Sequence, residues 1–421
     1  METRQVDVAI IGSGPAGLAA AIECATYGHH TIVIDEFMKK GGRLLGQLHE
    51  ESKNEWWNGI EESEKLNEKA VEAGVEFYME TSVVNIDKDD NYWVIETSKK
   101  AFKSSCVLVA TGAAESPIAL PGWTLPGVMS IGAAQVMTNV HRVKPGNKGI
   151  IIGINALTMA IARELQLAGV EVEGIYTSPY EPNIDAMNST PNDALDEMGR
   201  MAGLAPTIFL RMGSYFIGSD WLRRRVLQFY PSKGISVWGI PIHFNKTVQQ
   251  IFGREQVEGA MIHKIHADGE IAKSNYDQKE LDFVCISGGL YPLAELAAIA
   301  GCSFYNIPAL GGYVPLHSEK METTVEGLFV AGNITGIESA KVAIVQGTTA
   351  GQSISKFLDK ESKTLDERIE NSIRLQKQIR AEAPIQFHPD IQSGRKEMQK
   401  LWKEHVEQAA SFKKQEQISV K

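Results

Sequence analysis

Short apolar runs alternate with longer amphipathic stretches along most of the chain, and this pattern is clearest at its beginning. Residues 8–11 read Val-Ala-Ile-Ile, a run that is typical of a buried parallel strand. Three glycines follow, and the residues after them, 18–25, are rich in alanine and leucine, which favours a helix. A second apolar run covers residues 31–34. This order predicts a strand, a helix and a second strand that pair as a βαβ unit.

The three glycines of this unit have the G-x-G-x-x-G spacing of a dinucleotide site. Gly12 permits the tight turn, Gly14 has no side chain to keep a pyrophosphate away, and Gly17 lets the helix pack closely on the strand. The helix then presents free N–H groups and the positive end of its dipole to the phosphates. Asp35 ends the second strand, where a carboxylate can bind ribose hydroxyls. We therefore expect a dinucleotide site here, the alternative being a plain glycine turn.

The alternation returns near residue 148 and predicts a second βαβ unit with an altered fingerprint. Gly153 holds the first glycine position, but Asn155 and Thr158 hold the second and third. A side chain at Asn155 would crowd a pyrophosphate, and the next strand, Val170 to Tyr176, ends without an acid. This part of the chain should keep the fold of an NAD(P) domain. Whether it binds NAD(P), another nucleotide such as ATP, or nothing is left open by the sequence.

Between these units, a Gly-Gly-Arg sequence that includes Gly42 and Arg43 allows the backbone to approach a ligand closely, the alternative being a simple turn. The following stretch contains Gln47 and the adjacent Trp56 and Trp57, which could border a cofactor or a partner. For the two tryptophans we favour burial in the core. The cluster Arg223 to Arg225 is interpreted as a solvated helix face rather than a phosphate site.

Composition and charge narrow the classes of function. The chain has 421 residues, enough for two or three domains, and its net charge of −10 gives no support to a nucleic-acid role. No apolar run approaches the length of a membrane span, and the chain begins directly with a strand, so we expect no signal peptide and a cytoplasmic location. The four cysteines lie far apart, without a CxxC, which excludes a dithiol centre and a zinc site of that kind; no metal site is expected.

Several of these motifs together resemble the α subunits of heteromeric FAD-linked amino-acid dehydrogenases. The group includes the α subunits of proline and hydroxyproline dehydrogenase and of sarcosine oxidase, the A subunit of opine oxidase and the B subunit of hydrogen cyanide synthase. The resemblance covers about the first 360 residues and lies within the two-dinucleotide-domain flavoprotein superfamily. It is carried by the stretches Gly12 to Gly17, Asp35-Glu36, Gly41 to Arg43, Pro126 to Val128 with Gln135, Ala309 to Gly312, Gly327 to Gly332, Gly336 to Ala340, and Gly347.

The resemblance implies an α/β fold with two Rossmann-like dinucleotide-binding domains of the pyridine nucleotide-disulfide oxidoreductase type. The second domain is inserted in the first. We expect a discontinuous FAD-binding domain over residues 1–118 and 278–358, an NAD(P)-binding-like domain over 119–277, and a helical C-terminal tail over 359–421. Within the tail a helix is predicted near Glu397 to Ala410. The tail is interpreted equally well as a solvated helical pair and as a docking arm for a partner subunit.

The resemblance also implies which residues contact FAD. An Ala-Thr-Gly junction after a strand passes the cofactor, and a strand that ends at Gly332 brings Asn333 to the ribityl chain, where relatives have Asp. The implied cofactor-binding residues are Gly12, Gly14, Pro15, Ala16, Gly17, Asp35, Glu36, Gly42, Arg43, Gln47, Val84, Ala110, Thr111, Gly112, Gly332, Asn333 and Ala340. No catalytic residue can be assigned from the sequence.

In function, the resemblance implies an FAD-dependent oxidoreductase that acts on CH–NH or CH–NH2 donors, with amine oxidation at a flavin in a separate β subunit. This chain would then relay electrons, or oxidise a nicotinamide or dye substrate, and its expected partners are the β subunit and a small-molecule substrate. The tail lacks the clustered cysteines of relatives that bind an iron–sulfur cluster there, which removes such a cluster from this chain. Two alternatives stay open: a standalone NAD(P)H-dependent flavin oxidoreductase, and a non-catalytic nucleotide-binding assembly subunit.

Overall fold

The chain folds into two units in the computed structural model, each built around a mixed β-sheet. Unit 1 comprises Met1–Leu44, Gly59–Ala114 and Tyr291–Lys421, and unit 2 comprises Leu45–Asn58 and Glu115–Leu290. The structure describes residues 3–52, 55–89, 91–179, 190–192, 194–195, 230–231, 233–266, 270–272, 276–383, 387–388 and 390–419. The arginine cluster at residues 223–225 lies outside them. The predicted α/β fold with two Rossmann-like domains, one inserted in the other, is confirmed.

The sheet of unit 1 contains the predicted βαβ unit at its centre. Strand β1 (Thr3–Ile11) pairs in parallel with β2 (Thr31–Ile34) on one side and with β8 (Ala101–Val109) on the other, and α1 (Pro15–Thr26) connects β1 to β2. The strand order is β5-β2-β1-β8-β7-β6, with β21 also paired to β8. The remaining strands of unit 1 are β5 (Glu76–Tyr78), β6 (Val83–Asp89), β7 (Tyr92–Thr97), β19 (Phe304–Ile307), β20 (Gly312–Pro315) and β21 (Leu328–Val330).

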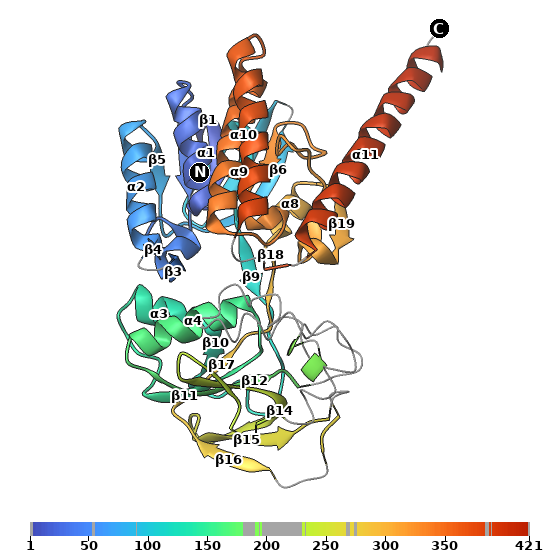
Figure 1. Ribbon diagram of the computed structural model, residues 1–421. Coiled ribbons are helices and arrows are strands. Elements are labelled where there is room, and N and C mark those ends of the chain that lie inside the picture. Colours follow the sequence, from blue (N-terminus) through green and yellow to red (C-terminus); the bar gives the residue numbers. More distant parts are fainter. Residues whose placement is uncertain are drawn as a thin grey trace. The chain divides into compact units, whose positions relative to one another are not determined.

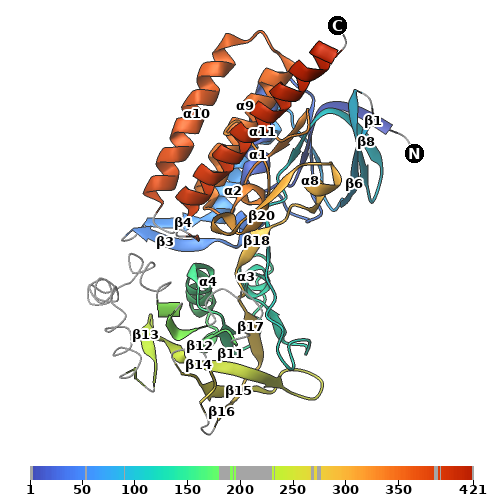
Figure 2. The ribbon, with the colours of Figure 1, turned by 90° about the vertical axis from the view of Figure 1, so that its right-hand side faces the viewer.

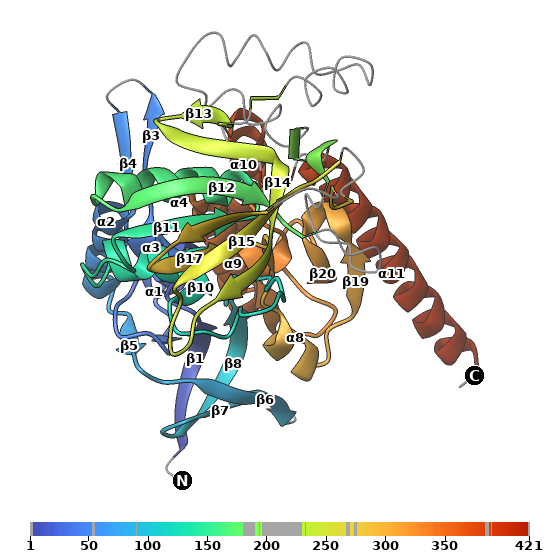
Figure 3. The same ribbon diagram turned by 90° about the horizontal axis from the view of Figure 1, so that it is seen from below.

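Helices of unit 1 pack against one another, and small residues such as Gly347 and Gly351 permit the close approach. Helix α1 packs against α9 (Ala340–Leu358), and α9 packs against α10 (Lys363–Glu382), as Figure 1 shows. The predicted tail helix is longer at both ends: α11 runs over Ile391–Ser419, and its far end stands away from the rest of unit 1 (Figures 1 and 3). The other helical elements of unit 1 are α2 (Gly59–Glu72), α8 (Glu295–Ile299), η3 (Pro308–Leu310) and η4 (Asn333–Thr335).

The sheet of unit 2 has the order β10-β17-β11-β12-β14-β15-β16, with β13 paired to β14. Strands β10, β17, β11, β12 and β14 run in parallel, and helices α3 (Ile131–Asn139) and α4 (Ala156–Leu167) lie on one face of them (Figures 1 and 3). The strands are β10 (Val128–Ser130), β11 (Lys148–Ile152), β12 (Glu171–Thr177), β13 (Ile235–Val237), β14 (Ile240–Phe252), β15 (Gly259–Lys264), β16 (Asp277–Glu280) and β17 (Phe283–Ile286).

The segment Leu45–Asn58 leaves unit 1 and becomes a β-hairpin of unit 2. It forms β3 (Leu48–Ser52) and β4 (Glu55–Asn58) after the short helix η1 (Gly42–Gly46). A two-stranded ribbon cannot bury both of its faces. The interpretation of Trp56 as a core residue is therefore wrong, because this side chain is 46% exposed.

The chain changes unit again at β9 (Ala113–Glu115) and β18 (Leu290–Pro292), which pair with each other. Along the described part of the chain, no helix combines the length and the apolar character needed to cross a membrane.

Candidate dinucleotide site

The glycine turn after β1 has the geometry that the sequence predicts for it. Gly12 has a φ of +104°, and a Cβ atom there would lie 2.5 Å from the Ala110 carbonyl oxygen. A Cβ atom on Gly17 would lie 1.9 Å from the Gly12 carbonyl oxygen. Both positions therefore need glycine for the fold itself, since backbone atoms occupy the space of a side chain.

Gly14 differs from the other two glycines because the fold does not require it. It is the N-cap of α1, with φ −71° and ψ −178°, and a Cβ atom there would meet nothing within 4 Å. Pro15 follows as the first residue of the helix and has no N–H group. Open space thus lies at a helix N-terminus, where backbone N–H groups and the helix dipole favour an anion. The turn fits the pyrophosphate of a dinucleotide.

Two other predicted motifs meet this turn. A Cβ atom on Gly42 would lie 2.9 Å from the Gly14 Cα atom, so the Gly-Gly loop touches the turn directly. The second motif is the strand end at Gly332 with Asn333, and a Cβ atom on Gly332 would lie 3.0 Å from that of Ala16. In the helix that follows, a Cβ atom on Gly347 would lie 2.0 Å from the Ala16 carbonyl oxygen. The fold therefore brings together stretches that are separated by hundreds of residues in the sequence.

The two acids after β2 have different environments. The Asp35 carboxylate accepts hydrogen bonds from the Ser13 backbone N–H (2.6 Å), the Ser13 hydroxyl (2.7 Å) and the Phe37 backbone N–H (2.8 Å). Glu36 is exposed and forms no hydrogen bond or ion pair with another described residue. Asp35 thus fixes the glycine turn, whereas the oxygens of Glu36 are available to a ligand.

The loops on the other side of β1 are held by side chain to backbone hydrogen bonds. Arg43 donates from Nη2 (2.9 Å) and Nε (3.2 Å) to the Ala113 carbonyl oxygen. The Thr111 hydroxyl donates to the Leu293 carbonyl oxygen (2.5 Å), and the next residue, Gly112, has a φ of +77°. These contacts fix the Ala-Thr-Gly junction that follows β8.

The second motif follows β21, and its polar groups are also engaged. The Gly332 N–H donates to the Oε1 atom of the buried Gln346 (2.8 Å). The Asn333 Oδ1 atom accepts from the Glu338 N–H (3.1 Å), which shapes the loop before α9. A carbonyl oxygen has a second lone pair, so Asn333 can still accept a ligand hydroxyl. Ala340 is the first residue of α9.

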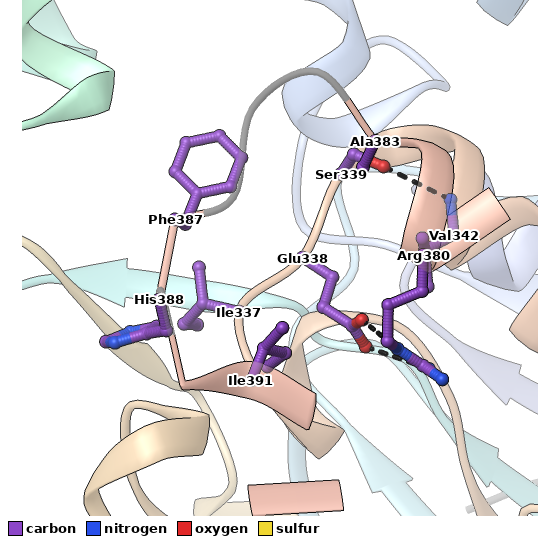
Figure 4. Close-up of a pocket in the computed structure, with 9 residues that line it drawn as sticks. All are labelled: Ile337, Glu338, Ser339, Val342, Arg380, Ala383, Phe387, His388 and Ile391. Carbon is purple, nitrogen blue, oxygen red and sulfur yellow. Dashed lines mark hydrogen bonds and ion pairs between the residues drawn. The ribbon is translucent and has the colours of Figure 1, made fainter. Parts of the chain in front are cut away.

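A buried ion cluster behind this loop was not predicted from the sequence. The Glu338 carboxylate, 5% exposed, pairs with Arg380 of α10 and Arg395 of α11 and accepts a hydrogen bond from Gln346 Nε2 (3.3 Å). Figure 4 shows the Glu338–Arg380 contact in a small pocket. Burial raises the pKa of this carboxyl, but the two guanidinium groups outweigh burial and hold its pKa below the usual value.

Next to the cluster, His317 is buried and neutral. Its Nδ1 atom lies 2.7 Å from the Pro315 carbonyl oxygen, and its Nε2 atom lies 3.3 Å from Arg395 Nη1. Burial and the positive charge of Arg395 lower the pKa of His317 to about 3. The Arg395 guanidinium also donates to the Thr335 carbonyl oxygen (2.9 Å), which ties α11 to the loop that contains Asn333.

In unit 2 the Asn155 side chain occupies the space at the helix N-terminus of the altered fingerprint. Asn155 is the N-cap of α4: its Oδ1 accepts from the Thr158 N–H (3.0 Å), and its Nδ2 donates to the carbonyl and the hydroxyl oxygens of Ser287 (both 3.1 Å). The asparagine side chain thus fills the place next to the helix N-terminus that glycine leaves open in unit 1. Strand β12 ends at Thr177 without an acid.

A second buried acid, in unit 2, attaches the hairpin segment to the helices. The Glu164 carboxylate accepts from Gln135 Nε2 (2.8 Å), Asn139 Nδ2 (2.9 Å) and the Leu48 backbone N–H (3.1 Å). Burial raises the pKa of Glu164 to about 7.

Two predicted residues are not among the contacts of the Gly14 turn. Gln47 belongs to unit 2, where its Oε1 atom accepts from Trp57 Nε1 (3.0 Å). Val84 lies on β6, which β7 separates from β8, and is 58% exposed. Neither residue contributes to the turn that the glycines form.

The helical residues that the sequence did not reveal share one property: their partners lie outside their own helix. Gln346 lies within a predicted helix, and Arg380 and Arg395 lie in a tail that reads as a charged surface. A weak signal existed, because arginine rather than lysine is favoured for buried ion pairs. Glu338 belongs to a stretch that carries the resemblance, but no role followed from it.

Comparison with known proteins agrees with these motifs. Residues 6–198 match the family described as pyridine nucleotide-disulphide oxidoreductase. The A subunit of opine oxidase from Agrobacterium tumefaciens (strain Ach5) is 26% identical over 362 residues, which cover 82% of this chain and 64% of that protein. The HcnB subunit of hydrogen cyanide synthase from Pseudomonas aeruginosa is 24% identical, and the match covers 86% of this chain and 73% of that protein. The resemblance to flavoprotein oxidoreductase subunits is confirmed.

Solved structures show the same fold. L-proline dehydrogenase from P. horikoshii matches 88% of this chain and 60% of its own, with a TM-score of 0.59 and 20% identity. Thioredoxin reductase from Lactococcus lactis matches 84% of this chain and 99% of its own, also with a TM-score of 0.59 and 20% identity. The chain spans about two thirds of the length of the first of the curated relatives, 64%, so further parts of that protein have no counterpart here.

Proposed function

We propose that this chain is an FAD-binding subunit of a heteromeric dehydrogenase that oxidises amino acids or other amines with CH–NH or CH–NH2 groups. The observation that carries the proposal is the open space at Gly14, at the N-terminus of α1, inside a turn that Asp35 and Ser13 hold in place. The fold maintains this space without filling it, as a pyrophosphate site requires.

Each motif around the turn has a proposed task. The Gly12–Gly17 turn holds the pyrophosphate, and the Glu36 carboxylate accepts hydrogen bonds from the ribose. Asn333 would accept one from the ribityl chain, and the Ala-Thr-Gly loop after β8 would contribute to the flavin site. A bound FAD supplies one- and two-electron transfer, whereas the protein binds, orients and electrostatically tunes it. The Glu338–Gln346 contacts keep the second motif in position.

The names of the relatives suggest the partner and the substrate class. The A subunit of opine oxidase, HcnB and the α subunit of sarcosine oxidase each belong to an enzyme with several subunits. By analogy, amine oxidation takes place at a flavin in a separate β subunit, and this chain receives the electrons. Disulfide reduction is not proposed, because the four cysteines are buried and free, and burial raises the pKa of each thiol.

The first experiment identifies what the purified protein carries. The protein is denatured, and the released molecules are measured by absorbance and mass spectrometry. We expect about one FAD per chain. Absence of FAD, with or without another nucleotide, would overturn the proposal and favour a non-catalytic nucleotide-binding subunit.

The relay role needs a second experiment. Steady-state dehydrogenase activity is measured with proline, hydroxyproline, sarcosine and glycine, with the chain alone and with a co-expressed β subunit. We expect activity only with the partner. Turnover of any of these substrates by the isolated chain would contradict the relay role while leaving the FAD site intact.

A standalone NAD(P)H-dependent flavin oxidoreductase is the second candidate, and one observation bears on it. The Asn155 side chain occupies the pyrophosphate position of unit 2 and is tied to Ser287. We therefore expect the flavin to stay oxidised when NADH or NADPH is added anaerobically. Rapid bleaching of the flavin absorbance would favour this candidate over the relay subunit.

A further inference from the structure

A large cleft lined mostly by charged and polar residues lies within unit 1, between α10 and α11. Its volume is about 650 Å³, and it is lined by residues of both helices and of the loop that contains His317. Figures 1 and 2 show the two helices close together at the beginning of α11 and splayed apart farther along it. The cleft is separate from the Gly14 turn, and the proposed function does not use it.

The charge of this cleft is opposite to that of the whole chain. Glu319 is the only carboxylate among the described residues that line it, whereas the protein carries a net charge of −10. The cations that line it are Lys377, Arg380, Arg395, Lys396, Lys400 and Lys403. Like charges three or four residues apart on a helix repel each other, so an anion beside the row on α11 would relieve this repulsion.

The cations form two layers with different roles. Arg380 and Arg395 are the buried layer, and both already pair with Glu338. In the outer layer, Lys377 pairs with Glu319 (2.7 Å) and Lys400 is 3.7 Å from Glu404. Lys396 and Lys403 are exposed and form no ion pair with another described residue. Two ammonium groups without an ion-pair partner among the described residues therefore line the cleft.

The shape and chemistry of this outer layer favour an extended ligand. Lys396, Lys400 and Lys403 occupy successive turns of α11 and extend along about 10 Å of the helix. Flexible lysines act as point charges, and the forked guanidinium groups that suit a compact phosphate are held by Glu338. Gln392 and Gln399, which also line the cleft, offer amide groups to a peptide backbone.

We propose that this cleft binds an acidic, extended segment of the partner subunit. The inference rests on the proposed function, because it assumes such a partner. It adds where the partner binds and what chemistry the bound segment has. The cleft floor is one side chain away from the second motif, since Arg395 contacts both Glu338 and Thr335. A docked segment would therefore rest on the residues that position Asn333.

The test uses a fluorescein-labelled octaglutamate peptide as the probe. The fluorescence anisotropy of this peptide is measured while the whole chain is titrated into it. We expect saturable binding that weakens when sodium chloride is raised from about 50 to 300 mM. The double variant Lys396→Glu/Lys403→Glu should bind at least about tenfold more weakly. Lys396→Ala/Lys403→Ala, which preserves helix propensity, should show a smaller loss in the same direction.

The matched control is Lys65→Glu/Lys69→Glu on α2, which changes the same charge at exposed positions outside the cleft. We expect this variant to bind the peptide like the unmodified protein. An equal loss in the control, or no binding of octaglutamate at all, would overturn the proposal. So would inorganic triphosphate that binds through Lys396 and Lys403 while octaglutamate does not, because the ligand would then be a small polyanion.

FAD content is measured on every preparation used in the titrations. Protein that contains FAD but does not bind the peptide contradicts only the docking cleft. Protein that lacks FAD contradicts the proposed function itself.

Discussion

Replacing Gly14 by alanine tests the cofactor site without disturbing the fold, which few substitutions in such a turn can do. Its backbone angles, φ −71° and ψ −178°, are ordinary for any residue, and the new methyl group would meet no protein atom within 4 Å. Alanine is a poorer N-cap than glycine, by about 0.5–1 kcal/mol. It also reduces the conformational freedom of the unfolded chain, which stabilises the protein by about 0.4–1 kcal/mol. The two effects nearly cancel.

The effect on FAD binding should be much larger. The introduced methyl group would occupy the open space at the N-terminus of α1, so the pyrophosphate could no longer approach the backbone N–H groups. Hydrogen bonds to charged groups contribute about 1.5–3 kcal/mol each. Loss of one such bond corresponds to roughly a 10- to 140-fold increase in Kd.

The assay has two parts, both carried out on apoprotein freed of cofactor. Chemical denaturation gives the free energy of unfolding, and quenching of FAD fluorescence gives the Kd. Gly17→Ala is the matched control: its methyl group would lie 1.9 Å from the Gly12 carbonyl oxygen, so it should destabilise the fold by about 3 kcal/mol or more. Wild-type FAD affinity in Gly14→Ala would refute the assignment of this space to the cofactor, and a strongly destabilised apoprotein would refute the geometry.

Three further predictions concern the buried polar groups. Because burial raises the pKa of Glu164 to about 7, the protonated side chain contributes about 3 kcal/mol to the free energy of unfolding below pH 4.5, and this contribution is lost as the pH rises through 7. Glu164→Gln should remove this pH dependence when chemical denaturation is measured at pH 5 and pH 8. An equal change in the free energy of unfolding between these pH values in the variant and the unmodified protein would contradict the prediction. Glu338→Gln leaves two buried guanidinium groups without their carboxylate and should lower the free energy of unfolding by about 3 kcal/mol, whereas Glu319→Gln in an exposed pair should change it by less than about 0.5 kcal/mol. Asn155→Gly opens unit 2 but adds no acid after β12, so a titration that follows NADH fluorescence should still show no saturable binding.

The local parts of the fold could be predicted because short-range rules determine them. The apolar run of β1, the three glycines and the alanine-rich α1 each specify their own conformation, and the strand order follows from the βαβ rule. The tail shows where such rules end. Gly394 reads as a helix breaker, yet it lies inside α11, where a Cβ atom would come within 3.0 Å of Ala309 and Leu310. Glycine is needed there for close packing, which no local pattern reveals.

The motifs of the candidate site could be predicted, but the hydrogen-bonding role of each neighbouring residue could not. Asp35 and Glu36 are both acids after a strand, and only the structure shows that Ser13 takes up the first and leaves the second available. The same holds for Glu338, whose partners lie on two helices of the tail. Interactions across long sequence separations depend on the finished fold, so residue types alone cannot assign them.

Because the chain leaves unit 1 and returns to it, strands of the same sheet are synthesised at widely separated times. Strands β1 and β2 emerge from the ribosome first, but β21, which pairs with β8 of the same sheet, begins only at Leu328. Translation at about 5–20 residues per second places roughly 15 to 60 s between Leu44 and β21. All of unit 2 is synthesised within that interval and can fold while the first sheet still lacks a strand. The nascent chain therefore presents an incomplete hydrophobic sheet for many seconds, which makes its production sensitive to chaperone supply and to translation speed.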